Sequence, residues 1–184
     1  DSKRINSFLN LNKGKKIIVV QGLGFVGAVM SIVCANALHE EYAVIGIDLP
    51  SPEAYWKICS INEGIFPIVS SDKKVEEYFQ NSIKKNNFYA TFDTYAFTKA
   101  DVIIVDINLD VQKQNNHIQS NKIVDYSVNL SGFESAIKSI GDGCKEDILV
   151  LIETTVPPGT TNLAKKIIQD CLRHRNLNPE KIKI

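Results

Sequence analysis

The sequence predicts an α/β protein in one domain, a doubly wound parallel sheet of the Rossmann type with about six strands and helices on both faces. Three observations favour this fold class. Short β-branched apolar runs alternate with helical segments along the chain, which is the order of right-handed βαβ units. The first run leads directly into a Gly-x-Gly-x-x-Gly hexamer. A chain of 184 residues is also long enough to bury one sizeable core.

Strands are expected where an apolar run has the length and composition of a buried parallel strand. Such runs cover residues 16–20, 42–47, 88–92, 101–106 and 147–152, and residues 181–184 look like the start of a sixth. Residues 1–14 are polar and charged, so they are expected to form a frayed lead-in or one short helix. The domain itself is assigned to residues 15–184.

Helices are expected in the intervals between the strands. They are predicted at residues 25–38, from Pro52 with Ser51 as cap, from Ser71 or Asp72 through Phe79, at residues 130–140, and from Thr160 or Thr161 to about Arg173. Gly141 and Gly143 are expected to end the fourth of these helices. Residues 61–72 predict an ordered loop, and the polar residues 108–127 predict a long mobile loop.

The charge balance and the cysteine spacing exclude several classes of protein. Lys+Arg and Asp+Glu number 21 each, so the net charge is zero, which argues against a nucleic-acid partner. No apolar run approaches the roughly 18 residues of a membrane span, so no membrane partner is expected. The four cysteines and three histidines are widely scattered, which predicts reduced thiols in a cytoplasmic protein and no metal site.

The glycine hexamer predicts a binding site for a dinucleotide diphosphate. It consists of Gly22, Leu23, Gly24, Phe25, Val26 and Gly27. Gly22 permits a sharp turn out of the strand, Gly24 lets a diphosphate approach the backbone, and Gly27 lets the helix pack close to the sheet. The free N–H groups and the positive end of the helix dipole then face the phosphate charge.

Asp48 is the expected partner of the adenosine ribose. It ends the second strand, 48 − 27 = 21 residues after the last glycine, where the dinucleotide fingerprint places an acid. Its charge would repel a 2′-phosphate, and no Arg or Lys occurs within residues 49–52, so the pattern favours NAD over NADP. The structural alternative is a tight strand–helix turn with an ordinary acid at the end of a strand.

A second candidate site follows the fifth strand, in the sequence ETTVPPGTT. The carboxyl ends of parallel strands form the ligand-binding edge of an open sheet. Thr155 could offer a fixed hydroxyl there toward the nicotinamide end of a dinucleotide, and Glu153 could be an acid of structural importance only. Alternatively, Thr154 or Thr155 merely satisfies local backbone groups.

Four segments in order resemble one known family: GLGFVG (22–27), INEGIFPI (61–68), ADVIIVDI (100–107) and ETTVPPGTT (153–161). The chain resembles the N-terminal NAD-binding domain of the UDP-glucose/GDP-mannose dehydrogenase family. The resemblance implies that Thr155 lies at the cofactor and a catalytic water, and that the turn with Ile107 contacts the cofactor. It also implies that Asn62 and Gly64 line the active-site half, while Thr91 is either a β-former or an adenine contact.

The resemblance further implies oxidation of the C6 alcohol of a UDP- or GDP-sugar to a uronate with two NAD per turnover, in the biosynthesis of polysaccharide precursors. The catalytic Cys, a Lys and the nucleotide-sugar domains lie C-terminal to this region in the family, whose members are homodimers. Residue 1 is Asp rather than Met, so the chain is expected to be part of a longer protein. By itself it is expected to bind NAD without turning over substrate.

Two departures from the family pattern stand out. After the fourth strand the family typically has Val-Pro-Thr-Pro, where this chain has Asp106, Ile107, Asn108, Leu109 and Asp110. The basic residue that usually follows soon after the ribose-binding acid is missing. Two alternatives stay open. The first is a β-hydroxyacid-type dehydrogenase, although such enzymes lack the ETTVPPGTT segment. The second is a stand-alone NAD-sensing module.

Overall fold

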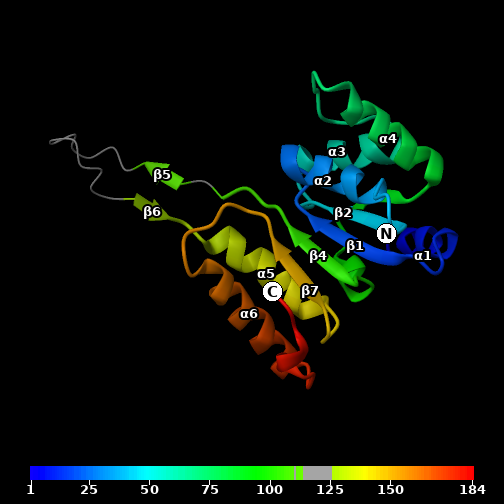
Figure 1. Ribbon diagram of the computed structural model, residues 1–184. Helices are drawn as coiled ribbons and strands as arrows, with labels where there is room; N and C mark the ends of the chain where they lie inside the picture. The colour runs from blue at the N-terminus through cyan, green and yellow to red at the C-terminus, as the bar shows by residue number, and fades with distance from the viewer. Residues whose placement is uncertain (110, 114–125) are drawn as a thin grey trace.

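The computed structural model describes residues 1–109, 111–113 and 126–184, and its centre is one parallel sheet (Figure 1). The strand order is β3-β2-β1-β4-β7, with every neighbouring pair parallel. The strands are β1 (Lys16–Gln21), β2 (Tyr42–Ile47), β3 (Phe88–Thr91), β4 (Val102–Val105) and β7 (Leu149–Ile152). The predicted doubly wound Rossmann architecture is confirmed.

Helices cover both faces of the sheet, and each face has its own apolar cluster (Figure 1). One face carries α2 (Phe25–Ala35), α3 (Pro52–Asn62) and α4 (Lys73–Lys85). The other carries α1 (Ser2–Leu11), α5 (Ser131–Gly143), α6 (Thr160–His174) and the short helix η1 (Thr94–Thr98). A short helix η2 (Pro179–Lys181) follows α6. Among the described residues, none of the helices is both long and apolar enough to cross a membrane.

Of the two forms expected for residues 1–14, the structure has the helix. α1 is amphipathic, and it places the fully buried Ile5 and the buried Phe8 into the cluster that also holds Val19 of β1. The Phe8 ring stacks on Tyr89 of β3, with 5.7 Å between ring centroids. The polar residues of this segment therefore form the outer face of a helix that packs on the sheet.

Several boundaries differ from the sequence expectations. α3 extends to Asn62, into the segment 61–72 that was expected to be a loop. α4 extends to Lys85, beyond the expected end at Phe79. Lys183 forms a single parallel bridge to Leu149, so the expected sixth strand amounts to one residue pair. Within the expected polar loop, β5 (Val111–Lys113) and β6 (Tyr126–Val128) pair antiparallel, apart from the main sheet. The rest of that loop, residues 110 and 114–125, lies outside the described residues.

The expectation that Gly141 ends a helix was wrong, because α5 continues through it, whereas Gly143 is the last residue of the helix. Gly141 is buried where α5 packs on α6. A Cβ atom added to it would lie 2.7 Å from Cβ of Cys171 and 3.2 Å from Cα of Ile168. The missing side chain therefore permits the close approach of two helices instead of a turn.

Gly141→Ala is expected to lower the free energy of unfolding by about 1–3 kcal/mol, because α6 must move to make room for the methyl group. Gly132→Ala, in the same helix, has no atom within 4 Å of the added Cβ and is the matched control. It is expected to leave stability unchanged or to raise it by up to about 1 kcal/mol. Urea unfolding of both variants measures this difference, and equal stabilities would contradict the close α5–α6 contact.

Candidate functional site

The candidate site lies at the carboxyl ends of the strands, where the strand order reverses. β1 is flanked by β2 on one side and by β4 on the other, so the connections leaving β1 and β4 run to opposite faces of the sheet. Ligands of open α/β sheets bind in the crevice that this reversal creates. The glycine turn follows β1 directly and stands at that crevice.

Two glycines of the turn are required by the packing of the backbone. Gly22 has φ +100°, and an added Cβ would lie 2.1 Å from the carbonyl oxygen of Asp106 at the end of β4. A Cβ on Gly27 would lie 1.9 Å from the carbonyl oxygen of Gly22. The sharp turn expected at Gly22 and the close helix packing expected at Gly27 are both present, and they fix the start of α2 against the sheet.

The third glycine is open to the outside. No atom lies within 4 Å of a Cβ added to Gly24, and the following Phe25 and Val26 are exposed. The first backbone bond of α2 runs from Ala28 N to Gly24 O (3.0 Å), and no side chain of the described residues caps the helix. The N–H groups of its first turn are thus available to an anion, and the space above Gly24 accommodates a diphosphate.

Asp48 is held next to this turn by three donors. Its Oδ1 accepts from Leu49 N (2.8 Å), and its Oδ2 accepts from Leu23 N (3.3 Å) and from Lys57 Nζ (2.7 Å). A carboxylate offers about four lone-pair sites, so Oδ1 keeps room for a ribose hydroxyl. The three bonds fix the side chain before any ligand arrives, so it needs no reorientation to accept a hydrogen bond from a ribose hydroxyl.

Lys57 is a site residue that sequence reasoning missed. Its Nζ also donates to Leu23 O (3.1 Å), so it joins α3, β2 and the glycine turn. The side chains of Lys57 and Asp48 are 19% and 14% exposed, which shelters the pair from solvent screening. The only signal was that Lys57 is the one basic residue of α3, nine positions after Asp48 rather than next to it.

Thr154, rather than Thr155, joins the ends of β4 and β7. The buried Thr154 hydroxyl accepts from Ile107 N (3.0 Å) and lies within hydrogen-bond distance of the carbonyl oxygens of Ile107 (3.1 Å) and Val105 (3.3 Å). The alternative of local backbone satisfaction therefore describes Thr154. Thr155 is exposed at the same edge, and its hydroxyl bonds to no other residue in the part of the chain that the structure describes.

The remaining predicted positions have mainly structural contacts. The Ile107 side chain packs on the α5–α6 face, so only its turn reaches the crevice. Thr91 donates to Asp1 Oδ2 (2.8 Å) and accepts from Asp93 N (3.0 Å). Gly64 has φ +80°. The Asn62 amide bonds to both N (2.9 Å) and O (2.8 Å) of Ala90, and so ties the end of α3 to the outer edge of β3.

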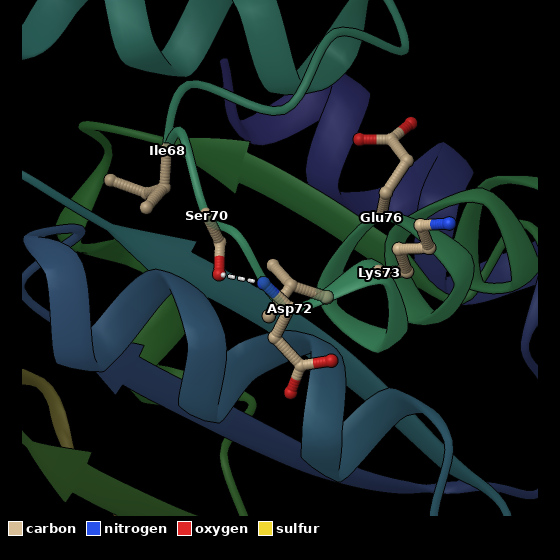
Figure 2. A pocket seen from close by; sticks show the side chains of 6 residues that line it. Ile68, Ser70, Asp72, Lys73 and Glu76 are labelled. Carbon is tan, nitrogen blue, oxygen red and sulfur yellow. Dashed lines mark hydrogen bonds between the residues drawn. The ribbon is translucent and has the colours of Figure 1, made fainter.

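Figure 2 shows a pocket at a different place, between the loop after α3 and the first turn of α4. Within the lining, Ser70 Oγ accepts a hydrogen bond from Asp72 N (3.1 Å). The pocket is lined by Ile68, Ser70, Asp72, Lys73, Val75 and Glu76. None of these residues ends a strand of the sheet, so the pocket is separate from the glycine turn.

Comparison with known proteins connects this geometry to one family. Residues 15–184 match the family model described as the NAD-binding domain of the UDP-glucose/GDP-mannose dehydrogenase family. The UDP-N-acetyl-D-mannosamine dehydrogenase of Pyrococcus horikoshii is 24% identical over 153 residues, which cover 83% of this chain and 32% of that protein.

Solved structures agree with this match. The NDP-N-acetyl-D-galactosaminuronic acid dehydrogenase of Methanosarcina mazei superposes with a TM-score of 0.72 at 24% identity, over 90% of this chain and 33% of the other. A ternary complex of the GDP-mannose dehydrogenase of Pseudomonas aeruginosa superposes with a TM-score of 0.66 at 28% identity, over 84% and 32%. The chain spans about a third of the length of these relatives.

Asp48→Asn is expected to weaken NAD binding roughly ten- to a hundredfold, because a hydrogen bond to a charged acceptor is replaced by one to a neutral amide. Calorimetric titration with NAD measures the change, and the melting temperature reports on the fold. Asp142→Asn is the control, since Asp142 lies near the end of α5, on the face of the sheet opposite α2, and pairs with Lys138 (2.8 Å). Equal NAD affinity in the wild type and Asp48→Asn would remove Asp48 from the site.

Proposed function

Because the chain belongs to the UDP-glucose/GDP-mannose dehydrogenase family as its NAD-binding domain, we propose that it is the coenzyme-binding part of a nucleotide-sugar 6-dehydrogenase. The observation that carries this proposal is the open turn at Gly24, which presents the uncapped start of α2 at the switch point of the sheet. Membership of this family replaces the β-hydroxyacid dehydrogenase alternative.

Each part of the site has a proposed role toward NAD. The turn from Gly22 to Gly27 binds the diphosphate through backbone N–H groups, and Asp48 accepts a hydrogen bond from the adenosine ribose. Lys57 keeps the Asp48 carboxylate in place through their 2.7 Å contact. Ile107 and Thr155 stand at the ends of β4 and β7, where the nicotinamide half of the dinucleotide would lie.

The proposed reaction of the whole protein oxidises the C6 alcohol of a UDP- or GDP-sugar to a carboxylate, with water supplying the second oxygen. Bound NAD supplies the hydride acceptor, and two NAD are reduced for each sugar oxidised. Thr155 is proposed to orient the reacting water with its exposed hydroxyl. Thr154 fixes the position of Thr155, because the hydrogen bonds of the Thr154 hydroxyl to Ile107 hold the end of β7 against the turn after β4.

The nucleophilic Cys and the Lys of this reaction are proposed to lie outside the chain. Burial raises the pKa of the Cys144 thiol to about 11, and burial also raises the pKa of Cys34 and Cys171. These three thiols stay protonated at neutral pH, whereas nucleophilic attack needs a thiolate. Cys59 lies in α3, which follows β2, whereas the nicotinamide half is proposed to lie at the ends of β4 and β7. The whole protein is proposed to be a cytoplasmic homodimer that supplies uronate precursors of polysaccharides.

The chain is expected to bind NAD at least roughly tenfold more tightly than NADP, because the Asp48 carboxylate repels a 2′-phosphate. Calorimetry with both coenzymes tests this preference. Asp48→Asn is the matched variant. It is expected to narrow the difference in affinity, because it weakens NAD binding and leaves NADP binding unchanged. Stronger binding of NADP by the wild type would overturn the assignment of Asp48, and a crystal structure with NAD bound away from Gly24 would overturn the site.

Mixed with NAD and UDP-glucose, UDP-N-acetylmannosamine or GDP-mannose, the chain by itself is expected to produce no NADH. The reason is that the nucleotide-sugar domains, the Cys and the Lys of the reaction are proposed to lie outside the chain, so the sugar is not positioned for the first hydride transfer and no nucleophile is present for the second. Absorbance at the NADH wavelength is the measurement, and calorimetric NAD binding in the same buffer shows that the protein is competent. Steady NADH production by the chain would contradict the proposal that the remaining catalytic groups lie elsewhere.

A further inference from the structure

We propose that the carboxyl group of Asp106 links dinucleotide affinity to pH, because it lies beneath the glycine turn and opposes the diphosphate only when it is ionised. This linkage rests on the diphosphate position in the proposed function. The resemblance to the family gave Asp106 no role, since it belongs to the segment in which this chain departs from the family's Val-Pro-Thr-Pro pattern.

Asp106 is built into the underside of the turn. Its N–H donates to Gln21 O (2.8 Å), and its carbonyl oxygen occupies the space that a Cβ on Gly22 would need. Its Oδ2 lies 3.3 Å from the position of a Cβ on Gly27, which is in the first turn of α2. The side chain therefore faces the same helix start whose N–H groups are available to the phosphates.

The Oδ2 atom is enclosed and has no hydrogen-bond partner among the described residues. Asp48, the other acid at the glycine turn, accepts hydrogen bonds from three donors. Enclosing a carboxylate oxygen without a donor disfavours the ionised form, and a protonated carboxyl removes the charge. The site thus contains one acid whose two oxygens both accept hydrogen bonds and one with an enclosed oxygen that accepts none from the described residues.

The charges around Asp106 add to this effect. Val105 and Ile107 pack on the α5–α6 face, so Asp106 points to the α2 face, where residues 22–30 carry no ionisable side chain. From β7 it faces Glu153, a second negative charge. Lys57, which contacts the glycine turn, is paired with Asp48 after β2, whereas Asp106 follows β4. The acids and bases of α5, which are Glu134, Lys138 and Asp142, belong to the opposite face.

The direction of the linkage follows from these contacts. Burial raises the pKa of Asp106 above its usual range, and the negative charge of Glu153 raises it further. A bound diphosphate brings more negative charge, so the pKa of Asp106 is higher in the complex than in the free protein. Binding then takes up a proton, and affinity falls as pH rises from the pKa of the free protein to that of the complex. Below and above this interval affinity does not change with pH.

The experiment is a calorimetric titration of the chain with NAD and with ADP-ribose between about pH 4 and about pH 8.5, an interval that begins at the usual pKa of Asp. The wild type is expected to lose affinity for both ligands, roughly three- to tenfold across the interval. Asp106→Asn is expected to keep the affinity of the low-pH wild type at every pH. Glu153→Gln is expected to shift the decline to lower pH without abolishing it. Asp142→Asn, on the opposite face, is expected to keep the wild-type profile.

A flat wild-type profile, or an Asp106→Asn profile equal to that of the wild type, would overturn the linkage. A decline seen with NAD and not with ADP-ribose would also overturn it, because only the nicotinamide distinguishes the two ligands. If Asp106→Asn does not fold, the shift in Glu153→Gln decides. Failure of the wild type to bind either ligand at any pH would instead refute the proposed function, so the two outcomes are distinguishable.

Discussion

The close approach of two backbone segments, at the ends of β1 and β4, is the constraint on which this structure depends. The Asp106 carbonyl and the Gly22 carbonyl occupy the space that side chains at positions 22 and 27 would fill. A Cβ at either position would push the turn away from the sheet, and the start of α2 would move with it. Because the proposed anion site is made of backbone N–H groups, its position depends on this contact.

The same contact brings two acids to opposite sides of one turn, with different surroundings. Asp48 is paired with Lys57 and oriented by two backbone N–H groups, which suits recognition of ribose hydroxyls. Asp106 has an enclosed oxygen and faces Glu153, which makes it a source of repulsion. Asp106 belongs to the segment in which this chain departs from the Val-Pro-Thr-Pro pattern of the family. The coenzyme site of this chain therefore combines a shared recognition element with an electrostatic feature of its own.

Local patterns were sufficient for the sheet and the turn, because buried parallel strands and the glycine hexamer are encoded by neighbouring residues. Sequence reasoning failed where the outcome depends on packing between distant segments. Lys57 reaches Asp48 only because α3 folds back over the end of β2. Gly141 looks like a helix end until α6 lies against it. Which of Thr154 and Thr155 clamps β4 depends on which face of the strand end meets the neighbouring turn, and adjacent threonines give no signal of that.

The amide of Asn62 has a consequence for how the sheet can be extended. It mimics a peptide group on Ala90, taking both the N–H and the C=O that β3 would offer to another strand. An incoming strand finds these groups occupied, so accretion from that side is blocked. On the far side, β7 already accepts a single parallel residue pair from Lys183. The two edges of the sheet therefore differ. Asn62 blocks the addition of a strand at the β3 edge, whereas the β7 edge can accept one.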